Sequence, residues 1–498
     1  MPRLPHGLSR YDQLIKANLE APAPSTPFPS TLGRLYPANP VFIQNLTHTR
    51  LIEIFEELTD SMGATGLLDG PAAAGMTFLG QFIDHDVTLD ATSALGTRIV
   101  PATIPNIRTP SLDLDCVYGA GPEASPHLYG GAGLEHFLLY GTAANPHDLA
   151  RTSNGVALIG DPRNDENHLV SQVQGAFIAL HNILMTKFTN EGGTRAEIHD
   201  CAQMGMSHTD WHAHVHPSNL SFEEVRRFVR LHYQWVIWNE FLPAFVDQSC
   251  LDEARIHDLF GADAAIMPVE FTGAAYRFGH ATTQPSYALT AGDVRDMHTL
   301  LGFGARPQAD NIDFAQFFDI DGATAPKARP VGPSLGEPLL RLPFVTEEME
   351  LADIGVTISV QQSKSLPLRN TLRDRYTYQL VNGEHIAADL NARHGSNLAV
   401  PDVHPTLATN GITKTPLWFY CLREAGEGGT QKLTGVGGAL VASVFARLLR
   451  LDPTTYWHAH GFQPWHGFHN PSGVLGGIMK FVETHRDSVA HADQLKNG

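Results

Sequence analysis

The sequence predicts a mainly α-helical protein, built as one large domain with long loops and little β structure. Apolar residues recur at helical spacing in three segments, residues 168–188, 221–246 and 435–453, and this period is typical of amphipathic helices. Alternating strand patterns are scarce. With 498 residues, of which 43% are hydrophobic, the chain can bury a large core.

The ends of two of these helices carry sequence signals. Ser221, with Glu224 three residues later, predicts an N-cap for the second helix, and Pro243 predicts its end. Asp452 and Pro453 close the C-terminal helix. We therefore expect helix boundaries at these residues.

Proline- and glycine-rich stretches predict where regular structure is interrupted. Residues 1–40 and 321–345 are rich in both residue types, which is typical of arms and loops on the surface. We find no internal repeat. The chain is therefore divided into an N-terminal arm, residues 1–40, and a single domain, residues 41–498.

Charge and composition narrow the classes of partner. The net charge of −18 gives no diffuse basic field, so neither nucleic acid nor an anionic membrane is expected to bind. No stretch approaches the ~20 apolar residues of a membrane span, and the first residues lack the apolar core of a secretory signal. We expect a cytoplasmic location by default, or export by a leaderless route. The cysteines follow neither a zinc nor a redox spacing, which predicts buried free thiols. They are Cys116, Cys201, Cys250 and Cys421.

The segment GQFIDHD, residues 80–86, places a histidine between two aspartates after an apolar run. If it is helical, Gln81, Asp84 and His85 share one face, while Asp86 points about 100° away from His85. The two carboxylates beside this imidazole are therefore expected to face two different sites.

The segment TPSLDLDCVYG, residues 109–119, has oxygen-bearing side chains at alternate positions. In an extended chain these side chains project to one side and can surround a hard cation. Calcium suits this ligand set better than zinc, because sulfur and imidazole are absent. A polar turn without a metal is the alternative interpretation. The four residues are Thr109, Ser111, Asp113 and Asp115.

Two further segments are weak signals when taken singly. Arg163 and Glu166 are three residues apart just before a helix, and such a pair is more often a surface salt bridge than a catalytic pair. His280 follows Gly279, which would let a flat ligand or another backbone approach closely. A lone histidine is nevertheless more often a satisfied core residue.

Together these segments resemble the animal-type haem peroxidases, the family that contains myeloperoxidase, and especially its compact bacterial members. The distal motif Gly-Gln-x-x-Asp-His-Asp stands at residues 80–86, and the Asp-x-Arg-x-x-Glu motif at residues 161–166. The proximal Arg-Phe-Gly-His stands at residues 277–280, and SLPLRNTLRDR resembles the Asn-x-x-Arg element through Asn370 and Arg373. The motifs occur in the family's order, and the likeness covers about residues 75–450.

The resemblance implies a haem b cofactor and a role for each residue around it. His280 would be the axial ligand of the haem iron, and Asn370 would accept a hydrogen bond from its other ring nitrogen. His85 would take a proton from hydrogen peroxide and return it to the departing oxygen. Arg163 would stabilise the charge that develops as the O–O bond breaks. Gln81 would hold a distal water or halide.

The resemblance also predicts how the haem is attached. Asp84 and Glu166 match the positions that form ester bonds to haem methyl groups in the family. Asn167 stands where myeloperoxidase has a methionine that makes a third linkage, so that linkage is absent here. Arg277 and Arg373 are expected to face the haem propionates, because arginine forks match carboxylates.

A calcium site is implied on the other face of the distal helix. Asp86 would join the oxygen-bearing side chains of residues 109–115 around the ion, which would hold His85 in place. Asp115 replaces the usual hydroxyl ligand, and Ser111 could contribute through its carbonyl alone.

The predicted function is a peroxidase that uses hydrogen peroxide to oxidise halides, thiocyanate or small aromatic donors. The alternative is a haem-dependent fatty-acid dioxygenase of the same superfamily, whose essential tyrosine lies three residues before the proximal histidine. That position is Arg277 here, and Tyr276 is one place off. A non-catalytic binding module is a third class, disfavoured by intact His85 and Arg163.

Histidine-rich stretches suggest one more alternative, a zinc hydrolase. Residues 208–216 and 458–469 contain His-x-His spacings, but no flanking carboxylates complete a ligand set. We predict that both are surface loops. We predict that His181, on the apolar stripe of its helix, is a core histidine bonded to backbone.

Overall fold

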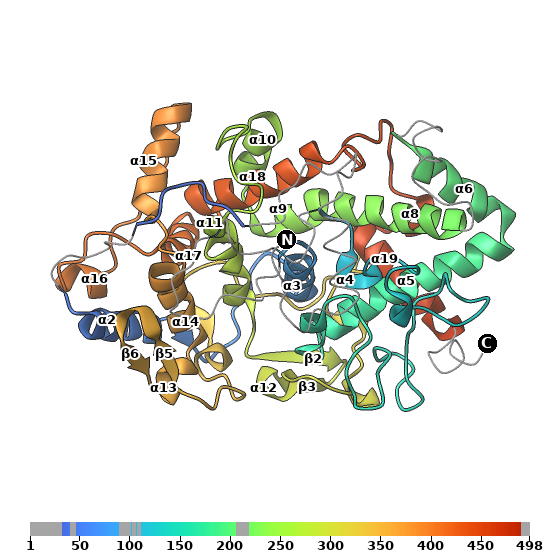
Figure 1. The fold of residues 1–498 in the computed structure, drawn as a ribbon, viewed down its shortest axis with the longest axis horizontal. Helices are drawn as coiled ribbons and strands as arrows, with labels where there is room; N and C mark the ends of the chain where they lie inside the picture. Colours follow the sequence, from blue (N-terminus) through green and yellow to red (C-terminus); the bar gives the residue numbers. More distant parts are fainter. Residues whose placement is uncertain are drawn as a thin grey trace, which may run out of the picture.

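Helices make up most of the regular structure. The computed structural model describes residues 32–39, 46–88, 101, 106, 111–205 and 219–489, and within them strands pair only in two-stranded sheets (Figure 1). The predicted mainly α fold with little β is confirmed. The α-helices are α2 His48–Asp60, α3 Gly75–Val87, α4 Asp115–Tyr118, α5 Val170–Asn190, α6 Gly192–Gln203, α8 Leu220–Val236, α9 Leu242–Phe245, α10 Gln248–Ile256, α11 Val269–Thr272, α12 Met297–Leu300, α13 Val360–Ser363, α14 Leu366–Leu372, α15 Gly383–His394, α16 Pro405–Thr409, α17 Leu417–Glu427, α18 Gly435–Leu451 and α19 Val474–His485.

The short strands of the described residues form two-stranded pairs and do not build a larger sheet. β1 Gly63–Ala64 pairs in parallel with β4 Leu335–Gly336. The antiparallel pairs are β2 Ser286–Thr290 with β3 Asp293–Asp296, and β5 Met349–Leu351 with β6 Val356–Ile358. Shorter helical turns carry part of the site: the 3-10 segments η3 Pro162–Asp165 and η6 Ala275–Thr282, and the π-helical segments η5 Ile237–Phe241 and η11 Arg373–Thr377.

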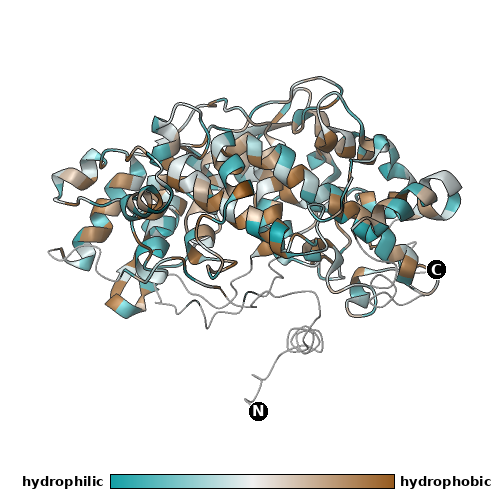
Figure 2. Ribbon diagram, turned by 90° about the horizontal axis from the view of Figure 1, so that it is seen from above, coloured by the Kyte–Doolittle hydropathy of each residue, from teal (hydrophilic) through white to brown (hydrophobic). Residues whose placement is uncertain are grey.

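Three helices pack together in the interior and fix the position of α3. Phe82 of α3 stacks on Phe177 of α5, with ring centroids 5.0 Å apart, and meets Tyr233 of α8 edge-on at 6.0 Å. All three rings are buried. Along the helices hydrophobic and hydrophilic residues occur side by side (Figure 2), as expected of helices with one buried face. The predicted helices at 168–188 and 435–453 are confirmed as α5 and α18.

The predicted boundaries of the second helix are wrong at both ends. α8 begins at Leu220 with Asn219 at the N-cap position. Ser221 does not cap the helix, because its hydroxyl lies 3.3 Å from His136 Nδ1. At the other end α8 continues through η5 into α9, which ends at Phe245. Pro243 stands in the first turn of α9, where its missing N–H is tolerated.

The predicted N-terminal arm, residues 1–40, lies mostly outside the described residues. Its described part is held by Glu270, which accepts hydrogen bonds from Leu35 N and Tyr36 N, both at 3.1 Å. Among the described helices, none combines the length and apolar content needed to span a membrane.

Gly160 holds the loop before η3 against α4. Its N–H donates to Cys116 O at 2.9 Å. A Cβ at this position would lie 2.2 Å from the carbonyl oxygen of Asp115, so only glycine allows this approach. The segments carrying Arg163 and Asp115 are therefore held together by backbone contact.

We predict that Gly160→Ala lowers the free energy of unfolding by about 1–3 kcal/mol, because overpacking against backbone forces the two segments apart. Gly192→Ala is the matched control, since a Cβ there would meet no atom within 4 Å. Urea unfolding followed by far-UV circular dichroism measures both. Equal midpoints for the two variants would contradict the contact.

Candidate active site

The predicted distal residues lie on α3, and its two aspartates have different surroundings. Asp84 accepts a hydrogen bond from Thr88 Oγ1 at 3.0 Å. Asp86 is fully buried and accepts one from Leu114 N at 3.2 Å. The carboxylates therefore face different sites, as the helical spacing predicted.

His85 is a buried, neutral imidazole. It is 5% exposed, and burial, together with the Arg163 guanidinium, lowers the pKa of His85 to about 4. Its Nδ1 lies 2.7 Å from Asn164 Oδ1. Near neutral pH such an imidazole can accept a proton. Asn164 could not be singled out from the sequence, because an amide between Arg163 and Glu166 carries no signal of its own.

Arg163 is tied to Asp161 and to the end of α3. Its Nε and Nη2 donate to the Asp161 carboxylate at 3.1 and 2.8 Å. Nη2 also donates to His85 O at 3.3 Å and to Thr88 O, so the cation satisfies carbonyls at the C-terminus of the helix. The surface pair with Glu166 that the sequence suggested is replaced by the pair with Asp161. The guanidinium is thereby placed beside His85.

Glu166 and Gln81 meet on the same side of α3. Gln81 Nε2 donates to Glu166 Oε1, while Gln81 Oε1 accepts from Asn167 Nδ2 at 3.1 Å. Burial raises the pKa of Glu166 to about 7. Asn167 also accepts from Val170 N at 2.8 Å, so it caps the start of α5 and orients Gln81.

The predicted proximal residues meet on η6 and α14. His280 Nδ1 lies 2.9 Å from Asn370 Nδ2, and Asn370 Oδ1 is buried without a hydrogen-bond partner. Turning the amide by 180° would place Oδ1 against Nδ1, where it can accept the ring proton. The pairing that the sequence predicted is therefore available to these two residues.

Two arginines stand near His280. Burial, with the charges of Arg277 and Arg373, lowers the pKa of His280 to about 3. Arg277 Nε donates to Thr272 O at 2.9 Å. A Cβ at Gly279 would meet no atom within 4 Å, so space is open next to the imidazole. His280 can therefore act as a neutral nitrogen ligand, and the two arginines can bind carboxylates.

The distal and proximal segments pack directly on each other. The hydroxyls of Thr77 on α3 and Thr282 on η6 lie 2.9 Å apart and are buried. Tyr276 OH donates to Gly80 O at 3.3 Å. Residues separated by about two hundred positions are thus brought to one site. The two neutral imidazoles and the arginines fit a haem.

Behind α3 lies a cluster of three carboxylates. One carboxylate oxygen each of Asp86, Asp113 and Asp115 lies within 4.8 Å of the others. Asp86 Oδ1 and Asp113 Oδ1 are buried without a hydrogen-bond partner. Burial and the neighbouring carboxylates raise the pKa of Asp86, and burial raises the pKa of Asp113 to about 6. Buried oxygens of like charge fit a hard cation such as calcium.

The predicted extended conformation of this segment is wrong. Leu114 adopts a left-handed conformation (φ 61°), and α4 begins at Asp115. The turn is held by the bond from Leu114 N to Asp86. Ser111 Oγ donates to Asp452 at 3.0 Å, and its carbonyl accepts from Asp113 N at 2.9 Å. Thr109 lies outside the described residues.

The histidine-rich stretches do not form a second metal cluster in the described part of the chain. The carboxylate cluster is the one group of three candidate ligands found there. His460, His466 and His469 are exposed, as predicted for a surface loop. Residues 208–216 lie outside the described ranges.

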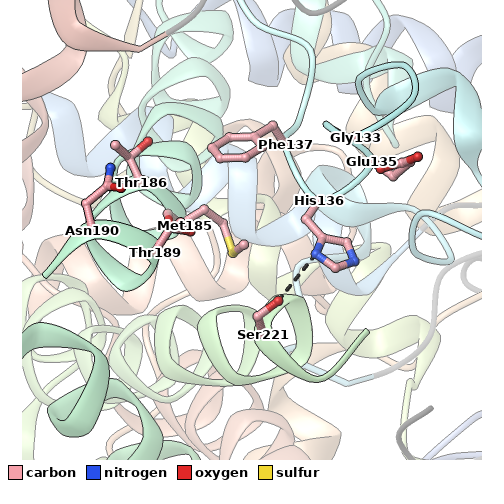
Figure 3. A pocket seen from close by; sticks show the side chains of 9 residues that line it. All are labelled: Gly133, Glu135, His136, Phe137, Met185, Thr186, Thr189, Asn190 and Ser221. Carbon is pink, nitrogen blue, oxygen red and sulfur yellow. Dashed lines mark hydrogen bonds between the residues drawn. The ribbon is translucent and has the colours of Figure 1, made fainter. Parts of the chain in front are cut away.

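A separate pocket of about 280 Å³ lies between the 133–137 loop, the end of α5 and the start of α8 (Figure 3). His136 and Ser221 meet at its edge, and no predicted site residue lines it. His181 is fully buried, and its Nε2 lies 2.9 Å from the backbone oxygen of His136, a residue that lines the pocket. The prediction of a core histidine bonded to backbone is confirmed.

The family model described as animal haem peroxidase matches residues 90–309. This range includes Arg163, Glu166 and His280; His85 lies just before it and Asn370 beyond it. No curated protein matches the chain in sequence.

Several solved structures share the fold. Peroxidase A from Dictyostelium discoideum matches with a TM-score of 0.59 at 14% identity, covering 91% of this chain and 94% of that chain. The fatty acid alpha-dioxygenase from Oryza sativa gives 0.54 at 15% identity, with 90% and 80% covered. The Arabidopsis thaliana fatty acid alpha-dioxygenase gives 0.51 at 12%, with 89% and 74% covered. At these identities the likeness concerns the fold.

Proposed function

We propose that the chain is a haem-dependent peroxidase, because residues 90–309 match the animal haem peroxidase family model and the fold is shared with a peroxidase. It would use hydrogen peroxide to oxidise halides, thiocyanate or small aromatic donors. The observation that carries this proposal is the neutral His85, beside Arg163, on a helix packed against the segment of His280. A base, a cation and an iron ligand are the groups that peroxide cleavage needs.

The residues around the proposed haem site would have different roles in the reaction with peroxide. Haem, when bound, supplies the redox chemistry toward peroxide. His280 would hold the iron through Nε2, while Asn370 orients the ring through Nδ1. His85 would take a proton from peroxide at Nε2 and return it to the departing oxygen. Arg163 Nη1 makes no hydrogen bond to the described residues, so it remains available to stabilise that oxygen.

We also propose that the haem is attached covalently and that a calcium ion binds behind the distal helix. Asp84 and Glu166 would form ester bonds to the haem, in which a C–O bond replaces a C–H bond of a haem methyl group. This is a two-electron oxidation, for which hydrogen peroxide would be the oxidant. Calcium would bind Asp86, Asp113 and Asp115, together with the Ser111 carbonyl.

The second candidate is a fatty-acid dioxygenase, favoured by one observation. Tyr276 is buried, and its phenol bonds to Gly80 on the distal helix, so a tyrosine does lie near the distal side. It precedes His280 by four residues rather than three, and its ring is held by stacking on Phe271. Retention of Asp84 and Glu166 further supports the peroxidase.

We predict that His85→Ala in haem-loaded protein slows the reaction with hydrogen peroxide by about 10²–10⁴-fold, because the proton acceptor is lost. His280→Ala should instead impair haem retention. Stopped-flow measurement of the Soret band follows both effects, with the exposed His460→Ala as control. A wild-type rate for His85→Ala would exclude its acid–base role. Oxygen uptake with linoleate, without peroxide, would favour the dioxygenase.

We predict that the haem stays with the polypeptide during acid–acetone extraction, because ester bonds survive it. Asp84→Ala and Glu166→Ala should each weaken retention, and the double variant should release the haem completely. The exposed Asp69→Ala is the control and should retain it. Complete release from the wild-type protein would refute the ester bonds.

We predict that calcium stabilises the protein, by about 2.7 kcal/mol at a concentration of 100 times Kd. Asp86→Asn and Asp113→Asn should reduce this gain, because each removes a charged ligand. Thermal unfolding with calcium and with EDTA measures it, and the exposed Asp263→Asn should behave as wild type. Equal unfolding temperatures in calcium and EDTA would contradict the site.

A further inference from the structure

We propose that Asn164 and Gln174 are positioning residues that hold His85 in a single tautomer, with the proton on Nδ1 and the lone pair of Nε2 directed to the site. The inference deepens the proposed function and rests on it for its catalytic consequence. The tautomer itself is a property of the protein alone.

Three hydrogen bonds connect His85 to a backbone carbonyl. Gln174 Nε2 donates to Cys116 O at 3.1 Å. Asn164 Nδ2 donates to Gln174 Oε1 at 2.8 Å. Asn164 Oδ1 lies 2.7 Å from His85 Nδ1. The chain runs from α4 through α5 and η3 to α3.

The first bond fixes the direction of all the others. A backbone carbonyl can only accept, so the amide nitrogen of Gln174 must face Cys116. Its oxygen is then turned to Asn164, which must present its own nitrogen to it. Asn164 Oδ1 consequently faces His85, and Nδ1 must be the donor. With Nδ1 protonated in the neutral ring, Nε2 is the acceptor.

Because these residues are buried, the donor-to-acceptor direction of the three hydrogen bonds is enforced. Asn164 and Gln174 are fully buried, and His85 is 5% exposed, so water does not replace a lost partner. The other tautomer would set the Nδ1 lone pair against Asn164 Oδ1, leaving two buried acceptors facing each other. Reversing the amides would do the same at Cys116 O.

The starting point of the chain adds a structural connection. Cys116 directly follows Asp115 of the carboxylate cluster, and Gly160 N also donates to Cys116 O. The carbonyl of Cys116 sets the direction of this chain of hydrogen bonds, which we call the relay. It belongs to the short helix α4, which is fixed by Gly160 on one side and by the Leu114 turn on the other. Because this acceptor is held in place, the donor and acceptor atoms along the relay keep their positions.

The test uses the apoprotein and then the haem-loaded protein. In ¹⁵N-histidine-labelled apoprotein, NMR reports which ring nitrogen of His85 carries hydrogen, with the signal assigned from its loss in His85→Gln. We expect Nδ1–H alone in the wild type. Asn164→Leu and Gln174→Leu should give a mixture or Nε2–H.

In haem-loaded protein, Asn164→Leu should slow the reaction with peroxide by about 10–100-fold, the usual size of such supporting contacts. Asn182→Leu is the matched control: Asn182 is equally buried on α5, but it bonds to the Leu138 backbone. It should change neither tautomer nor rate.

The outcomes separate the two proposals. A wild-type His85 protonated on Nε2, or an Asn164→Leu variant unchanged in both tautomer and rate, would overturn the relay and leave the peroxidase proposal standing. A wild-type rate for His85→Ala would overturn the acid–base role, while the NMR result would still decide the tautomer. Loss of rate in Asn182→Leu as large as in Asn164→Leu would assign the effect to stability and refute positioning.

Discussion

The contact between α3 and η6 is the constraint on which the site depends. The buried hydroxyl pair Thr77–Thr282 and the bond from Tyr276 to Gly80 hold a helix against a segment about two hundred positions later. A helix is rigid over two turns, so fixing it at these points also sets the direction of His85. The same contacts hold η6 on both sides of His280, at Tyr276 and at Thr282.

Burial then determines the charge state of the site. It favours the neutral forms of His85, His280 and Glu166, while arginines supply the positive charge on both sides. Neutral imidazoles are the form that can bind a metal or accept a proton. An anionic ligand with a metal at its centre suits this combination of neutral imidazoles and arginines.

The sequence was informative where a motif and a helical period coincided. The distal motif lies within α3, and Asp84 and Asp86 separate as the period requires. Prediction failed where tertiary contacts decided the backbone: the Leu114 turn exists because Asp86, far along the chain, accepts its N–H. The Asn164 relay was equally hidden, since its members share no local spacing and single amides carry no chemical signal.

His85 and Asp86 are adjacent in sequence, and both are connected to α4 by different routes. Asp86 reaches α4 directly, through Leu114 N and the carboxylate cluster. His85 reaches it through Asn164, Gln174 and the carbonyl of Cys116. A displacement of α4 therefore moves both the cluster and the acceptor that orients the imidazole. The carboxylate cluster and the orientation of His85 therefore share one structural support, the segment of Leu114 to Cys116.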